Sequence, residues 1–180
     1  MKLRRMAIIN LCFEVKRIIE TVIGRTDFTY LLEMPDDDKQ IVFAADYVED
    51  INYKMPVCVV DADYFEMEPI EIGGSFWDVA SVTVDIICVN KAESMDIAEQ
   101  VLNGLIGSHN FYDFNTNADI PDVNATYDPS SLPAVITTQW EVTSEEDFSQ
   151  SVLKLTNTTE PNYAKRYQST LAGTIRYIRD

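Results

Sequence analysis

The sequence predicts an α+β fold in which a mainly antiparallel β-sheet with a long hairpin is packed by an N-terminal and a central α-helix. Three observations support this fold. Helical apolar spacing opens the chain, two long strand-like segments then flank a Gly-Gly turn, and a second helical stretch follows. With 180 residues, of which 46% are hydrophobic, the chain suits a single domain over residues 1–180, with a long loop insertion at about 108–131.

The first helix is predicted for residues 6–23. Apolar residues recur there at the spacing of one helix face, at positions 8, 11, 12, 15, 18, 19 and 22. Gly24 is placed to end the helix in a left-handed conformation. Lys16 and Arg17 lie in mid-helix and are expected to be solvated, whereas Arg25 lies where a cation meets the negative end of the helix dipole. Charged residues directly after the apolar run favour this helix over a signal peptide.

Two long strands and a tight turn are predicted next. Residues 56–68 combine the buried run VCVV with an acidic half, and residues 79–89 alternate between apolar and polar side chains. Gly73 and Gly74 lie between them and form the turn of the hairpin. Further strands are expected at FTYLLEM, KQIVFAADY, LPAVITTQWEVT and STLAGTIRYI.

The second helix is predicted for residues 94–106. Ser94 is a suitable N-cap, and Asp96 and Glu99 favour the positive end of the helix dipole. Gly104 and Gly107 are expected to loosen its end. The predicted buried stripe consists of Ile97, Ala98, Val101, Leu102 and Leu105.

The charge balance limits the class of protein. Thirty acidic residues against fourteen basic ones leave a formal charge of −16. Because clusters of Lys and Arg bind phosphates, the chain is not expected to coat nucleic acid, although it could surround it without holding it. No apolar run is long enough to span a membrane. Cys12, Cys58 and Cys88 lie far apart in apolar stretches and are expected to be reduced core residues of a cytoplasmic product.

The sequence contains no recognisable catalytic constellation, so no catalytic, cofactor-binding or metal-binding residue is predicted. His109 is the only histidine, and it is expected to be an ordinary surface-loop residue. One enzymatic alternative stays open, because Asp61 and Asp63 share a strand face and could hold a divalent metal ion together with Glu66. A second alternative is an acidic mimic of nucleic acid that blocks a host protein.

Two regions are expected to mediate assembly. Residues 108–131 lose all periodicity, yet their aromatic residues argue against disorder. We expect an ordered loop that packs on a neighbouring subunit, with packing on its own domain as the alternative. The long hairpin also needs a surface to lie on. The predicted interface residues are Gly73, Gly74, Phe76, Trp77, Phe111, Tyr112 and Phe114.

The order of these elements resembles the tail-terminator and neck (head–tail joining) proteins of tailed bacteriophages. In that family an N-terminal helix is followed by strands with a hairpin, a second helix and closing strands. Residues 108–131 and 144–168 are longer than the compact family pattern requires. The resemblance is carried by MPVCVVDADYFEMEPIEIGG, SVTVDIICVNKAESMDIAEQVLNGL, LPAVITTQWEV and TLAGTIRYIRD.

The resemblance implies a structural virion protein with no enzymatic activity and no cofactor, assembled in the host cytoplasm. Such proteins form a homo-oligomeric, commonly hexameric ring that caps the tail tube and joins it to the head. The implied partners are further copies of the chain and the tail tube, sheath or connector proteins, with no membrane. An acidic lumen would repel DNA, which would pass through without specific binding.

Overall fold

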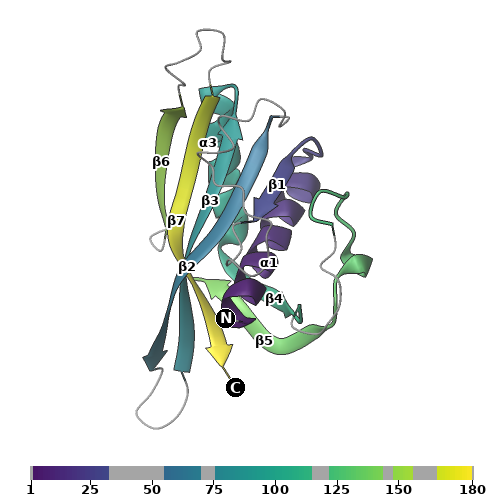
Figure 1. Cartoon of the computed structure of the whole chain (residues 1–180), viewed down its shortest axis with the longest axis vertical. Helices are drawn as coiled ribbons and strands as arrows, with labels where there is room; N and C mark the ends of the chain where they lie inside the picture. The colour runs from purple at the N-terminus through teal and green to yellow at the C-terminus, as the bar shows by residue number, and fades with distance from the viewer. Residues whose placement is uncertain are drawn as a thin grey trace.

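A computed structural model describes residues 2–32, 55–69, 76–114, 122–143, 148–155 and 166–179. Helix α1 (Lys2–Arg17) continues into the π-helical turn η1 (Ile18–Ile23), and helix α3 (Lys91–Leu105) lies beside it. Both helices pack on one face of a curled sheet of seven strands (Figure 1). This arrangement confirms the predicted α+β class. Within the described residues, no helix is both long and apolar enough to cross a membrane.

The sheet has the strand order β1-β2-β3-β7-β5-β4, and β6 pairs with β7 off this path. All neighbouring strands are antiparallel except β1 and β2, which are parallel. A short 3₁₀ turn, η2 (Pro129–Ser131), precedes β5. The strands are β1 (Thr29–Leu32), β2 (Val57–Pro69), β3 (Phe76–Cys88), β4 (Gly107–Tyr112), β5 (Val135–Val142), β6 (Phe148–Leu155) and β7 (Arg166–Arg179).

The long hairpin is formed by β2 and β3, as the sequence predicts. The two strands pair from Val57 opposite Ile87 to Pro69 opposite Phe76. Each has 13 residues and therefore spans roughly 43 Å. The ends of β2, β3 and β7 nearest the hairpin turn extend beyond the helices (Figure 1). The turn glycines, Gly73 and Gly74, lie outside the described residues, as does the expected strand KQIVFAADY.

The core lies between the helices and the sheet. The predicted alternation in β3 is confirmed, because Val82, Val84 and Ile86 are all buried on the helix-covered face. Leu171 and Ile175 of β7 join the same cluster. A smaller cluster on the other face consists of Val57, Val59 and Ile87.

The three cysteines are buried and free, as predicted for core residues. Burial raises the pKa of Cys12 and of Cys88 to about 12. Burial also raises the pKa of Cys58 above its usual range. Because the thiolate is the reactive form, these thiols are poor nucleophiles.

One residue ends η1 and another begins α3. Gly24 adopts φ 78° and ends η1, which confirms the predicted left-handed cap. Helix α3 begins at Lys91, earlier than predicted, because Asn90 is its N-cap and accepts a 2.9 Å hydrogen bond from the Ala92 N–H. Ser94 is not the cap. It is buried within the helix, where its hydroxyl donates to the Ile86 carbonyl (3.1 Å) and lies 2.6 Å from the Ser169 hydroxyl.

The segment predicted as an ordered loop at 108–131 also contains regular secondary structure, which the sequence did not predict. Its first residues form β4, and its last residues form η2. Residues 115–121 lie outside the described part of the chain. The alternation that should have indicated β4 is absent because exposed polar residues occupy most of the strand, GSHNFY.

Candidate functional site

The β2–β3 hairpin concentrates negative charge. Residues 57–88 contain seven acidic residues and no Lys, Arg or His. The end of this hairpin nearest its turn extends beyond the helices (Figure 1). A segment of this kind repels phosphate and attracts basic surfaces. The acidic residues are Asp61, Asp63, Glu66, Glu68, Glu71, Asp78 and Asp85.

The predicted interface residues Phe76 and Trp77 open strand β3 in the same region. They pair with Pro69 and Glu68 of β2 and with Arg179 and Ile178 of β7. The structure therefore places both residues next to the hairpin turn, on the strand that joins β2 to β7.

The geometry of a metal site at Asp61, Asp63 and Glu66 is not supported by the strand. A β-bulge lies between Ala62 and Tyr64, so Asp63 interrupts the regular pairing with β3. Strict alternation would have placed Asp61 and Asp63 on one face, and a bulge breaks that alternation. Within the described residues, no group of three or more His, Cys, Asp or Glu side chains could hold a metal ion.

A different carboxylate, Asp85, lies half-buried on the sheet face opposite the helices. Burial raises its pKa, and a hydrogen bond donated by the Thr170 hydroxyl opposes that shift. Beside it is a shallow hollow of about 340 Å³ between β3 and β7. The hollow is lined by Ser81, Val82, Thr83, Ala172, Gly173 and Thr174.

The aromatic interface prediction is corrected for two of its residues. Phe111 and Phe114 are buried in the core of this chain, 3% and 4% exposed. Phe114 stacks on Phe13 of α1, and Phe111 meets the edge of the Tyr177 ring. Tyr112 is partly buried against the same core. The alternative reading, packing on the chain's own domain, therefore describes these side chains.

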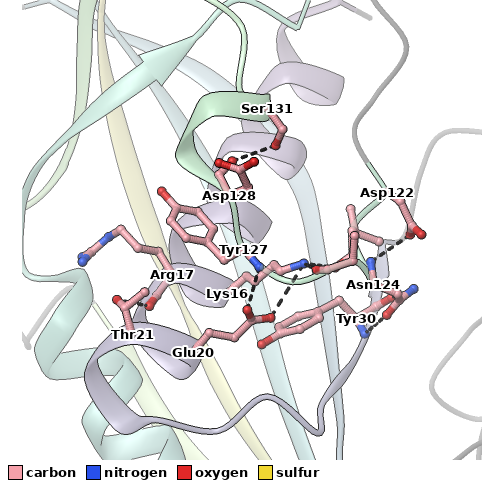
Figure 2. Close-up of polar contacts among 12 residues, drawn as sticks. Lys16, Arg17, Glu20, Thr21, Tyr30, Asp122, Asn124, Tyr127, Asp128 and Ser131 are labelled. Atoms are coloured by element: carbon pink, nitrogen blue, oxygen red, sulfur yellow. Dashed lines mark hydrogen bonds and ion pairs between the residues drawn. The ribbon is translucent and has the colours of Figure 1, made fainter.

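The most unexpected side chain is Lys16, which the sequence predicted to be solvated. It is 1% exposed, and its ammonium donates a 2.6 Å hydrogen bond to the Val123 carbonyl and another to the Ala125 carbonyl. The Glu20 carboxylate lies 3.7 Å away. Figure 2 shows Lys16 reaching from α1 toward the segment before η2. Lys16 can be buried because three oxygen acceptors compensate the charge of its ammonium group.

Polar contacts around Lys16 and Glu20 hold residues 122–131 against the helix. The Tyr127 N–H donates a 2.7 Å hydrogen bond to Glu20, and the ammonium of Lys16 lies 5.2 Å from the centre of the Tyr30 ring (Figure 2). Asn124 exchanges two hydrogen bonds with the main chain of Tyr30, at 2.7 and 3.2 Å. Lys16, Glu20 and Asn124 therefore act together as an anchor for this segment.

His109 also differs from its prediction as a surface-loop residue. It lies in β4, where its Nε2 is 2.8 Å from the Leu105 carbonyl and its Nδ1 is 3.0 Å from Glu14. Its ring packs on Trp140 with 4.5 Å between centroids. Arg17 donates to the same Glu14 carboxylate at 2.6 and 2.9 Å. Both imidazole nitrogens face oxygen atoms, so neither is available to bind a metal ion.

Comparison with known proteins does not assign this chain to a family. Neither a protein-family model nor a curated protein matches the chain. The likeness to phage tail-terminator and neck proteins therefore stays an expectation from the order of elements.

Proposed function

We propose that this chain is a structural subunit of a tailed-bacteriophage virion, a tail terminator or neck protein that forms a ring between the tail tube and the head. The observation that carries the proposal is the acidic β2–β3 hairpin, which extends beyond the helix-packed core (Figure 1). A ring lumen lined by such hairpins would let DNA pass, because carboxylates repel phosphates.

The proposed partners follow from this role. Copies of the chain make the ring, and tail tube, sheath or connector proteins dock on its two ends. Assembly takes place in the host cytoplasm and the product is part of the virion. The proposal assigns no reaction to the chain.

Charge reversal on the hairpin tests the DNA-facing role. Wild-type protein should not retard duplex DNA in a gel at low salt. Replacing Glu66 and Glu68 by Lys should create binding that weakens as salt rises. The matched control replaces Asp96 and Glu99, which are exposed on α3, by Lys and makes the same change in net charge. Equal retardation by the two variants would contradict a DNA-facing hairpin.

The enzymatic alternative is tested separately. Calorimetric titration with Ca²⁺, Mg²⁺ and Mn²⁺ should give no tight binding. Tight binding that is lost in the Asp61→Asn and Asp63→Asn variants would favour a metal-dependent enzyme instead.

The concentrated acidic charge on residues 57–88 also supports the nucleic-acid mimic. A mimic would be a monomer that binds a basic protein. The chain itself would have no binding site for DNA. Isolation of such a monomeric complex, with no affinity for tail proteins, would replace the ring proposal.

A further inference from the structure

Strand β6 lies at an open edge of the sheet. It pairs with β7 along its whole length, from Phe148 opposite Gly173 to Leu155 opposite Arg166. No other described strand pairs with it, and Figure 1 draws no element on its outer side. Main-chain N–H and C=O groups along such an edge are a template for another strand.

In the other edge strands, β4 and β1, an asparagine side chain hydrogen-bonds to the main chain of one residue. Asn10 of α1 accepts a 2.7 Å hydrogen bond from the Tyr112 N–H and donates a 3.0 Å bond to the Tyr112 carbonyl. Asn124 makes the same exchange with Tyr30 of β1. In both places the side-chain amide takes the position of a neighbouring strand. Strands β4 and β1 are therefore protected at these residues against pairing with another chain.

The extended part of β2 is protected in a different way. Strand β1 pairs only with residues 57–60 of β2. The following residues carry a bulge after Ala62 and four acidic residues before Pro69. Bulges, charges and proline are the devices by which natural sheets prevent edge-to-edge association.

Strand β6 carries little of this protection. Its sequence, FSQSVLKL, has one charged residue and no proline, and its register with β7 contains no bulge. Ser149, Gln150 and Ser151 are exposed and uncharged. Phe148 joins the core on the helix-covered face, and Val152 on the same face is only half-buried. The edge is thus accessible. Around its middle, Ser149 and Ser151 share one face, and Gln150 shares the helix-covered face with Phe148 and Val152, where its amide donates a 3.4 Å hydrogen bond to the Met95 carbonyl.

We propose that β6 pairs antiparallel with β6 of a second copy of this chain, across a two-fold axis perpendicular to the sheet. Such an axis keeps the two helix layers on the same face, so even-numbered residues oppose even-numbered ones. With Gln150 at the axis, Phe148 lies opposite Val152 of the second copy, and Ser149 lies opposite its Ser151. Each apolar side chain on the helix-covered face then meets an apolar one.

This self-pairing favours a second copy over an unrelated strand. The register matches apolar to apolar and hydroxyl to hydroxyl at both ends of the axis, and each match occurs twice. The half-buried Val152 gains a cover that the described part of its own chain does not give it. Both hydrogen-bonding edges are also used at once, which joins two subunits and leaves no further β6 edge.

The pairing goes beyond the proposed ring. A two-fold contact joins two copies and stops, whereas a ring requires a head-to-tail contact. The β6 contact is therefore a property of the free chain and forms in addition to any ring contact. Its absence would leave the ring proposal untouched.

Paired charge variants test this register. Wild-type protein at about 100 µM should have the mass of a dimer by size exclusion with light scattering. This concentration should exceed the dissociation constant, because a small contact is expected to have a Kd in the micromolar range. The double variant Ser149→Lys with Ser151→Lys places like charges opposite each other and should be monomeric. Ser149→Glu with Ser151→Glu should also be monomeric. An equimolar mixture of the two should restore a dimer with one copy of each.

The control variant is Gln100→Lys with Asn103→Lys on the exposed face of α3, which changes the charge equally and should stay dimeric. Hydrogen exchange of the wild type gives a second readout, because amides of residues 148–152 that face the second copy should exchange faster when the protein is diluted. A monomeric wild type, a dimeric double-lysine variant or a mixture that stays monomeric would each overturn the proposal.

Discussion

At the scale of single residues, Lys16 is the side chain whose position most affects the fold. Breaking a buried ion pair by removing one partner leaves the other charge uncompensated. We expect Lys16→Met to lower the free energy of unfolding by about 3 kcal/mol, because Glu20 and two carbonyls lose their partner. Urea denaturation at neutral pH measures the change.

The control for Lys16 is Lys91→Met at the exposed start of α3, which should change stability by less than about 0.5 kcal/mol. If both variants lost the same stability, the buried ammonium would contribute no more than an exposed one. Resistance of residues 122–131 to proteolysis should fall in Lys16→Met alone, because that segment loses its anchor.

Glu14 predicts a pH dependence. Burial raises its pKa, but hydrogen bonds from His109 and Arg17 outweigh burial and hold the pKa below the ordinary value of 4.5. A carboxyl whose pKa is lowered by folding adds stability above its unfolded pKa and loses it as the pH falls through the folded value. Wild type should therefore exceed Glu14→Gln in stability by about 1.5 kcal/mol at pH 7, and this difference should shrink below pH 4.5.

Denaturation curves collected from pH 7 down to pH 3 give the Glu14 comparison, with the exposed Glu99→Gln as control. A stability difference that is constant over this range would show that the Glu14 contacts do not depend on its ionised form.

At the scale of elements, the contact between α3 and η1 depends on Gly104. A Cβ atom there would lie 2.9 Å from three side-chain atoms of Ile18, which is fully buried. The glycine was predicted to loosen the helix end, but it permits close packing instead. Gly104→Ala should destabilise by about 1 kcal/mol, because overpacking of about 1–3 kcal/mol exceeds the gain of about 1 kcal/mol in helix propensity.

Thermal unfolding monitored by circular dichroism measures this change. The adjacent Asn103→Ala, on the exposed face, should stabilise slightly through helix propensity alone. Stabilisation by both substitutions would mean that Ile18 can move aside without cost.

The elements themselves were predictable where one face is regular. Strand β7 is predicted as a strand from its alternating sequence, and Leu171, Ile175 and Tyr177 on one of its faces are buried. In helix α3 the predicted stripe residues Ile97, Ala98, Val101 and Leu105 are buried and Leu102 is half-buried, whereas the predicted cap was wrong. Local periodicity suffices for such segments because one side faces the core along their whole length.

The polar contacts could not be predicted from local pattern. Lys16 is buried by carbonyls that lie 107 and 109 residues away in the sequence. The partners of His109 come from α1 and α3, and Asn10 meets Tyr112 across 102 residues. No spacing rule relates residues so distant, so a charged or amide side chain on a helix appears solvated until the fold is known.

At the scale of the whole molecule, the acidic hairpin and the edges of the sheet are suited to different interactions. The acidic hairpin points away from the helix-packed core (Figure 1). The edges of β1 and β4 are closed by Asn124 and Asn10, which limits uncontrolled pairing. A chain with these properties is suited to assembly through defined surfaces, as the proposed neck subunit requires.

Electron microscopy is the most direct test of whether this chain forms a ring at the end of a phage tail. Purified protein would be imaged alone and after mixing with tail tubes, since a tube end can be needed to start the ring. We expect rings with an open centre, or added density at the tube end that faces the head. A chain that stays monomeric with every tail protein and turns over a substrate at a measurable rate would contradict it.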